Sequence, residues 1–310
     1  MKQLLRTAAC ALALSLGLVA AGSGTAAQAA SSTTYREGGL ATAVTNFVVS
    51  PGYLRGVNDW GCVPSPEHPD PVILQHATFV NFGSNFVKLA PRLRNEGYCV
   101  YAQNYGMTLS SLGRIGGLGQ VSRSVTAFGT FVDQVRTRTG AAKVDVVGHS
   151  QGGLVPYAYI KTAGGAAKID DYVSWGGSQN GTTLNGIATL GQSLRLLGFA
   201  EAFASLLQAP GVTDQARGSR FMDALQADPS VPAGPDYMTI QTRYDTVVTP
   251  SSTQSIPGAE NVVLQNLCAD NRVGHVGLFL DEPTLQLTVN ALNDGPEGFR
   301  PTCGGYGPAL

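Results

Sequence analysis

The segment Gly-His-Ser-Gln-Gly-Gly at residues 148–153 constrains the fold of this chain more than any other feature. It follows a run of β-branched residues typical of a buried strand, and it precedes a run with helical periodicity. A Gly-x-Ser-x-Gly turn between a strand and a helix aims the serine hydroxyl into a cleft. We therefore expect Ser150 to be a nucleophile. The alternative is a structural glycine-rich turn, because short matches arise by chance in a chain with 39 glycines.

A serine nucleophile needs a general base, and this chain has only four histidines. In the architecture that uses this turn, the order along the chain is serine, acid and then histidine. His275 is the only histidine after the serine, and it lies in a glycine-flanked loop after the last predicted strand. We expect His275 to be the base. His68 and His76 are expected to be structural, and the side chain of His149 to point away from the active face of the turn.

The acid that orients the base should lie between the serine and the histidine, at the carboxyl end of a strand. Asp245 directly follows the strand predicted for residues 237–242, and we expect it to be the acid. Asp270 is the alternative, although it lies close to the histidine on the same loop. Asp170 and Asp171 precede a predicted strand, which places them at the opposite edge of the sheet.

Two backbone amides should stabilise the oxyanion that forms when the serine attacks a carbonyl carbon. One is expected from Gln151, the residue after the nucleophile. The other should come from the loop after the strand predicted for residues 71–76. Thr78 is the best candidate in that loop, and its hydroxyl is a further possible donor.

Short apolar runs alternate with helical patterns along most of the chain. This alternation predicts an α/β fold with a mostly parallel, doubly wound sheet and helices on both faces. Strands are predicted over residues 71–76, 98–102, 143–147, 172–175, 237–242 and 262–264, and helices over residues 86–95, 121–139 and 154–162. The segment 181–235 departs from the alternation, because it is long, helical in pattern and interrupted by glycines.

That segment contains Ile187, Leu190, Leu194 and Leu197, which share one helical face. An apolar face over an active site would suit an acyl chain or a lipid surface. An acyl-binding lid or wall and an ordinary core helix are both open interpretations.

The first 29 residues have the pattern of a secretory signal peptide. Lys2 and Arg6 precede a short apolar run, and Ala27-Gln28-Ala29 fits the small-x-small cleavage pattern. We expect an extracellular protein cleaved near Ala29, with residues 30–310 forming one catalytic domain. A membrane anchor is the weaker alternative, because the apolar run is short and interrupted by glycines.

Four cysteines follow the leader: Cys62, Cys99, Cys268 and Cys303. An even number in an oxidising compartment implies disulfides. Short loops favour the pairs Cys62–Cys99 and Cys268–Cys303, although three pairings are possible and the sequence alone does not choose. A zinc site is the weaker alternative, because no Cys-x-x-Cys or His-x-x-x-His spacing occurs.

Composition excludes several classes of protein. The net charge is −1 and 43% of the residues are hydrophobic, which argues against nucleic-acid binding and against intrinsic disorder. No run of eighteen apolar residues follows residue 30, so we expect no transmembrane segment in the mature chain. We also expect a monomer.

Several stretches are similar to one known family. Asn-Asp-Trp-Gly-Cys at 58–62, Gly-Tyr-Cys-Val at 97–100, the serine turn and Arg-Tyr-Asp-Thr-Val-Val-Thr-Pro at 243–250 resemble the secreted bacterial class 2 lipases of the α/β-hydrolase fold. The resemblance spans about residues 50–300. It implies hydrolysis of acylglycerols and other fatty-acyl esters without a cofactor or a metal, and its triad maps onto Ser150, Asp245 and His275.

Two departures from the family pattern bear on substrate preference. His76-Ala77 stands in place of a usual His-Gly, and Asn180-Gly181-Thr182 in place of His-Gly-Thr. The leading expectation is a secreted triacylglycerol lipase that meets its substrate at a lipid–water interface. A short-chain carboxylesterase or a polyester depolymerase with the same triad is the alternative. A peptidase and a non-catalytic binding protein are weaker ones.

Overall fold

The core of the fold is a parallel sheet whose strand order places the serine turn near its centre. The structure, a computed structural model, describes residues 33–183, 185–186, 188–189 and 209–310. Within them, six parallel strands form one sheet in the order β2-β1-β3-β4-β5-β6. The strands are β1 (Val72–Gln75), β2 (Val100–Ala102), β3 (Val144–His149), β4 (Ile169–Trp175), β5 (Asp236–Gln241) and β6 (Glu260–Val263). The predicted fold class is confirmed.

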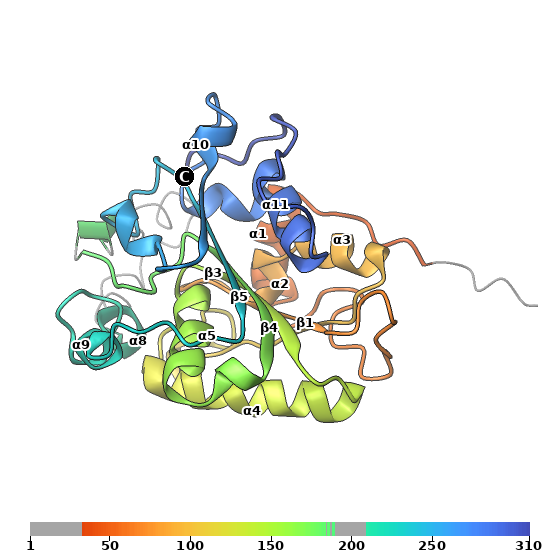
Figure 1. The fold of residues 1–310 in the computed structure, drawn as a ribbon, viewed down its shortest axis with the longest axis horizontal. Helices are drawn as coiled ribbons and strands as arrows, with labels where there is room; N and C mark the ends of the chain where they lie inside the picture. The colour runs from red at the N-terminus through yellow and green to blue at the C-terminus, as the bar shows by residue number, and fades with distance from the viewer. Residues whose placement is uncertain (1–32, 184, 187, 190–208) are drawn as a thin grey trace, which may run out of the picture. The chain divides into compact units, whose positions relative to one another are not determined.

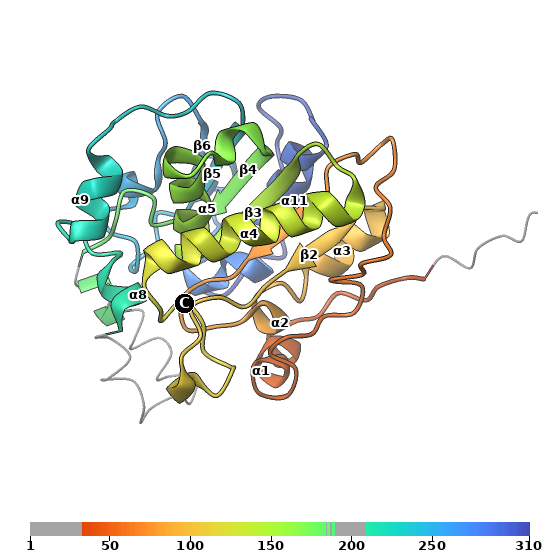
Figure 2. The same ribbon diagram turned by 90° about the horizontal axis from the view of Figure 1, so that it is seen from below.

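Helices cover both faces of this sheet (Figures 1 and 2). Residues of α4 and α5 pack on one face, and residues of α3 and α11 on the other. The described α-helices are α1 (Leu40–Val49), α2 (Phe82–Asn85), α3 (Leu89–Glu96), α4 (Val121–Thr139), α5 (Gln151–Thr162), α8 (Pro210–Thr213), α9 (Arg220–Gln226), α10 (Leu264–Leu267) and α11 (Glu282–Leu292). Short 3₁₀ helices are η1 (Leu109–Ser111), η2 (Gly165–Ala167), η3 (Ser251–Gln254) and η4 (Val276–Leu280).

The two apolar cores follow from the alternation of side chains along the strands. In β1, Val72 and Leu74 join the core beneath α3 and α11, while Ile73 joins the core beneath α4 and α5. Successive side chains of a strand point to opposite faces, so a continuous apolar run serves both cores. The sheet is therefore covered on both faces, and its carboxyl edge is left to carry polar groups.

Several predicted helices have different bounds in the structure. The helix expected over residues 86–95 is α3, which begins three residues later, at Leu89, while a separate short helix, α2, ends at Asn85. Pro91 is the third residue of α3, where the missing amide hydrogen costs nothing, so the proline fits a helix start rather than a helix interior. The helix expected from residue 154 begins at Gln151, directly after the serine. The sequence analysis did not predict α1 or α11.

Both favoured disulfides, Cys62–Cys99 and Cys268–Cys303, are present. In the segment 181–235, the structure describes α8 and α9, while Ile187, Leu190, Leu194 and Leu197 lie outside the described residues. None of the described helices is both long and apolar enough to cross a membrane.

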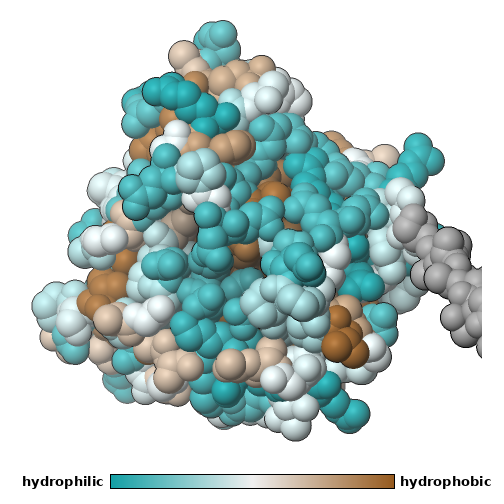
Figure 3. Space-filling view, turned by 45° about the vertical axis from the view of Figure 1, so that its right-hand side comes forward, coloured by the Kyte–Doolittle hydropathy of each residue, from teal (hydrophilic) through white to brown (hydrophobic). Residues whose placement is uncertain are grey.

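The face of the molecule drawn in Figure 3 is mainly hydrophilic, with apolar residues in separate patches. Large apolar side chains that are exposed include Val48 and Val49 on α1, Leu109 on η1 and Leu112 directly after η1. The backbone carbonyl of Val48 accepts a hydrogen bond from Arg114, which connects α1 to the loop after η1. The exposed apolar groups of these two elements therefore belong to neighbouring segments.

Candidate active site

Ser150 occupies the sharp turn between β3 and α5. Its backbone dihedrals are φ 58° and ψ −123°, a conformation that residues with a side chain rarely adopt. A Cβ atom at Gly148 would overlap the carbonyl oxygen of Gly152, and one at Gly152 would overlap that of Gln75. The Ser150 amide donates to the carbonyl of Trp175 at 2.9 Å, which ties the turn to β4. Such strain persists only where the surroundings hold it, and it is typical of functional sites.

Asp245 and His275 form a buried pair at the same edge of the sheet. Asp245 follows β5, His275 precedes η4, and His275 Nδ1 donates to Asp245 Oδ2 at 2.7 Å. Because Nδ1 holds its proton against the carboxylate, the neutral ring presents an unprotonated Nε2. Nε2 is buried and has no hydrogen-bond partner among the described residues. The pair therefore has the geometry of an acid that orients a base.

Three further donors surround the carboxylate of Asp245. The amides of Val247 and Val248 both donate to Oδ1 at 2.8 Å, and Gln254 Nε2 donates to Oδ2 at 2.9 Å. Hydrogen bonds to an ionised carboxylate favour the charged form. Gly176, at the end of β4, leaves room for the pair, because a Cβ there would lie 3.0 Å from His275 Nδ1 and 3.1 Å from Asp245 Oδ2.

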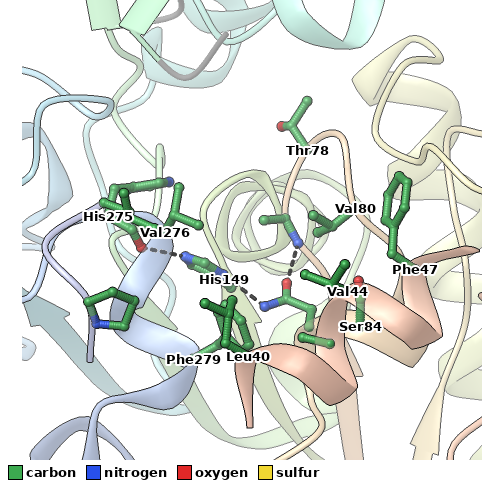
Figure 4. Close-up of a pocket in the computed structure, with 15 residues that line it drawn as sticks. Leu40, Val44, Phe47, Thr78, Val80, Ser84, His149, His275, Val276 and Phe279 are labelled. Atoms are coloured by element: carbon green, nitrogen blue, oxygen red, sulfur yellow. Dashed lines mark hydrogen bonds between the residues drawn. The ribbon is translucent and has the colours of Figure 1, made fainter. Parts of the chain in front are cut away.

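His149 does not point away from the site as expected, but lies beneath the loop of His275 (Figure 4). Its Nε2 donates to the carbonyl oxygen of His275 at 3.0 Å, and its Nδ1 accepts from Asn85 Nδ2 at 3.0 Å. Burial, together with the nearby His275, lowers the pKa of His149 to about 3, so its ring is neutral at physiological pH. Asn85 Oδ1 accepts from the Ala77 amide at 2.8 Å. A chain of hydrogen bonds thus joins the loop of His275 to the loop of Thr78.

The amides expected to bind an oxyanion are free of protein acceptors. Neither the Thr78 amide nor the Gln151 amide donates to another group in the described part of the chain. Gln151 is the first residue of α5, where amides have no partner within the helix. Thr78 precedes Phe79, whose φ of 68° is unusual for a bulky residue. The Phe79 amide donates to the carbonyl of Gly116 at 3.0 Å, which fixes this loop.

Glutamine side chains form hydrogen bonds that support the segments carrying Thr78 and Gln151. Gln151 Nε2 donates to the carbonyls of Gly117, at 3.1 Å, and of Gly211, at 2.6 Å. Gln215 Nε2 donates to Thr78 Oγ1 at 3.2 Å, so the threonine hydroxyl keeps its own proton for another acceptor. The sequence analysis missed both Gln215 and Gln254, because neither lies in a motif or a periodic pattern.

The other candidate residues lie elsewhere. Asp270 is exposed. Asp170 and Asp171 were predicted to precede a strand, but they are part of that strand, β4. They lie at its amino end. His76 is buried against Tyr105, and burial lowers its pKa to about 4. His68 packs on the ring of Tyr98. In the described ranges, no cluster of three or more histidine, cysteine or acidic residues could hold a metal ion.

An apolar cleft opens beside the pair. Both Thr78 and His275 lie in its wall. Helix α1 supplies one side of it and η4 the other (Figure 4). The apolar lining includes Leu40, Val44, Phe47, Val80, Val276 and Phe279. The proposed base and Thr78 therefore line a single cleft suited to a hydrocarbon chain.

Comparisons with known proteins identify a family and a similar fold. A family model described as "Lipase (class 2)" matches residues 69–278. The crystal structure of Aspergillus fumigatus lipase B has a TM-score of 0.55 at 18% identity, over 80% of this chain and 62% of that one. The present chain thus spans less than two thirds of that lipase. This likeness concerns the fold.

Two further solved structures have lower TM-scores. The mature form of Bacillus licheniformis lipase BlEst2 has a TM-score of 0.47 at 14% identity, over 64% of this chain and 84% of that one. The esterase EaEST from Exiguobacterium antarcticum also has a TM-score of 0.47, at 17% identity, over 72% of this chain and 91% of that one.

Proposed function

The chain belongs to the class 2 lipase family, and from that premise we propose that it is a secreted serine hydrolase of fatty-acyl esters, with triacylglycerols as its main substrates. Ser150, His275 and Asp245 are its proposed triad. The observation that carries the proposal is the buried Asp245–His275 pair, which lines an apolar cleft and whose Nε2 has no partner among the described residues, together with the strained serine turn at the same edge of the sheet.

In the proposed reaction, Ser150 Oγ attacks the ester carbonyl carbon while His275 Nε2 takes its proton. The charge that develops on the carbonyl oxygen rests on the amides of Gln151 and Thr78. His275 then gives the proton to the departing alcohol, and an acyl-enzyme remains on the serine. Water, deprotonated by the same histidine, attacks this ester, and the histidine returns the proton to Ser150 Oγ as the fatty acid leaves. Asp245 stays ionised throughout and stabilises the imidazolium.

The lining of the cleft supports a substrate with a hydrocarbon chain. Nearly all of the cleft wall is apolar, and helix α1 contributes Leu40, Val44 and Phe47 to it. Burying a methylene group is worth about 0.8 kcal/mol, so each carbon of an acyl chain that enters the cleft strengthens binding. A peptide substrate would leave polar backbone groups unpaired against the same wall.

The test compares the wild-type protein with Ser150→Ala on triolein emulsions and on a short soluble ester. We expect Ser150→Ala to lower kcat by about 10⁴-fold or more on both substrates, because no other group can form the acyl-enzyme. Ser122→Ala is the matched control, since Ser122 is exposed on α4, and it should keep wild-type rates. Activity retained in Ser150→Ala would refute the proposed triad. A wild-type protein that hydrolyses only the short ester would be a carboxylesterase instead.

A further inference from the structure

Residues 307–310 lie directly against the loop that carries His275. The amide of Gly274 donates to the carbonyl of Pro308 at 3.1 Å, and the amide of Val276 donates to the carbonyl of Leu310 at 2.7 Å. Both neighbours of His275 are therefore hydrogen-bonded to this segment. The carbonyl of His275 itself accepts from His149, so the backbone of the histidine is held from two sides.

The contact is so close that three of its positions admit only glycine. A Cβ at Gly274 would overlap the carbonyl oxygen of Leu310, and one at Gly277 would overlap that of Pro308. From the other side, a Cβ at Gly307 would overlap the carbonyl oxygen of Gly277. None of these three glycines has a left-handed φ, so the close approach of the two backbones, rather than their conformation, explains the residue type.

Two further ties fix the segment to the same region. Asp281, which is fully buried, accepts from the Gly307 amide at 3.1 Å and from Asn271 Nδ2 at 3.0 Å. Its other oxygen accepts from Thr284 at the start of α11. The Cys268–Cys303 disulfide joins the chain before His275 to the chain before residue 307. Residues 307–310 are thus fixed to the loop of His275 through buried hydrogen bonds and a nearby disulfide.

We propose that residues 307–310 are a positioning segment, which fixes the backbone of His275 so that Nε2 faces Ser150. This inference rests on the proposed function. His275 lies in a loop, directly before the short η4. Its position is therefore set by the segments that contact this loop. A base displaced by about 1 Å can cost about 10²-fold in rate. The segment acts through the histidine and needs no contact with the reacting atoms.

The test compares Gly307→Ala with Gly304→Ala, which lies three residues before the segment. Gly304 is the matched control, because a Cβ there would meet nothing within 4 Å. The measurements are kcat and KM on a short soluble ester, the amount of Ser150 that a phosphonate ester labels at completion, and Tm. We expect Gly307→Ala to keep its labelled sites and to keep KM within about twofold, while kcat per labelled site falls by about 10–10²-fold. Gly304→Ala should match the wild type.

A merely structural role would lower the number of labelled sites and leave kcat per site unchanged. A kcat per labelled site within about twofold of the wild type in Gly307→Ala would therefore overturn the inference, whatever its Tm. If Gly307→Ala does not fold, a chain ending at Gly307, which lacks both carbonyl acceptors, is judged by the same criterion. Loss of the fold in both variants also overturns it. Wild-type protein and Ser150→Ala are measured in the same assay. Activity retained in Ser150→Ala would refute the proposed function, whereas its loss there leaves any failure with the positioning segment alone.

Discussion

Buried aspartates at the two edges of the sheet have opposite surroundings. At the carboxyl edge, Asp245 accepts hydrogen bonds from four donors, including His275. At the amino edge, Asp145 at the start of β3 accepts from the amide of Asp171 and faces the carboxyl groups of Asp171, Asp70 and Asp170. Burial, with these like charges, raises the pKa of Asp145 well above its usual value. Burial, with the charges of Asp294 and Asp170 nearby, raises the pKa of Asp171 to about 7.

The hydrogen-bond partners of buried carboxyl groups differ between the two edges. Asp245, Asp145 and Asp171 are all buried, but Asp245 accepts from four donors, whereas Asp145 accepts from the amide of Asp171. Strand β3 links the two edges, because Asp145 lies near its start and the proposed nucleophile follows its end. The comparison suggests that the donors around Asp245 serve the reaction, while the amino edge carries an electrostatic cost.

The largest expected effect comes from removing the charge at the carboxyl edge. Asp245→Asn should lower kcat by about 10³–10⁴-fold on a short soluble ester, because an amide cannot hold the histidine in the tautomer that leaves Nε2 free. Asp145→Asn, the matched change at the other edge, should leave kcat within about twofold. Steady-state kinetics of the two variants decide the matter. Equal losses would show that the edges do not differ in the way described.

A smaller effect is expected from removing one donor to Asp245. Gln254 donates to both the Asp245 carboxylate and the Val248 carbonyl. Gln254→Ala should lower kcat by about tenfold, since a hydrogen bond to a charged group contributes about 1.5 kcal/mol. Gln286→Ala serves as control, because that side chain bonds Glu282 away from the site. An unchanged kcat in Gln254→Ala would mean that the remaining donors suffice.

The smallest effect should appear at the amino edge, and only in stability. The pKa of Asp171 is raised from 3.8 to about 7 in the folded protein. Between these two pH values, Asp171 is therefore protonated in the folded state and ionised in the unfolded state. Its contribution to stability is thus fully present below pH 3.8 and is lost as pH rises through about 7. Asp171→Asn should raise Tm at pH 8, by about 2–4 °C per kcal/mol regained.

The same substitution should also narrow the difference in Tm between pH 5 and pH 8. Thermal unfolding at the two pH values is the measurement. Asp133→Asn is the control, since Asp133 is exposed on α4 and paired with Lys168, outside this cluster. A wild-type Tm that does not fall between pH 5 and pH 8 would contradict the expected titration of Asp171.

How far the sequence predicts this site depends on how local each signal is. The turn around Ser150 is predictable, because its glycines and its flanking strand and helix are adjacent in the chain. The assignment of Asp245 and His275 needs only strand positions and chain order. Helix α1 was not predicted, although its sequence carries a signal: Leu40, Ala43, Val44, Phe47 and Val48 have the spacing of one apolar helical face.

Contacts between distant segments are the part that the sequence does not predict. Gln215 reaches Thr78 across 137 residues, and Gln254 reaches Asp245 from η3. Glutamine has no preferred motif for such a contact, so composition and periodicity carry no signal for it. The direction of the His149 side chain was mispredicted for a related reason, because it depends on the loop of His275 that folds over it.

The order of the site residues along the chain has a consequence for synthesis. Thr78, Ser150 and Gln151 belong to the first strands, whereas Asp245 and His275 follow β5 and β6. A ribosome delivers the amino-terminal part first, so the proposed nucleophile and its oxyanion amides emerge well before the proposed acid and base. A growing chain would therefore hold a serine but no partner to activate it. Under the proposed mechanism, ester cleavage is a property that the nascent protein acquires late.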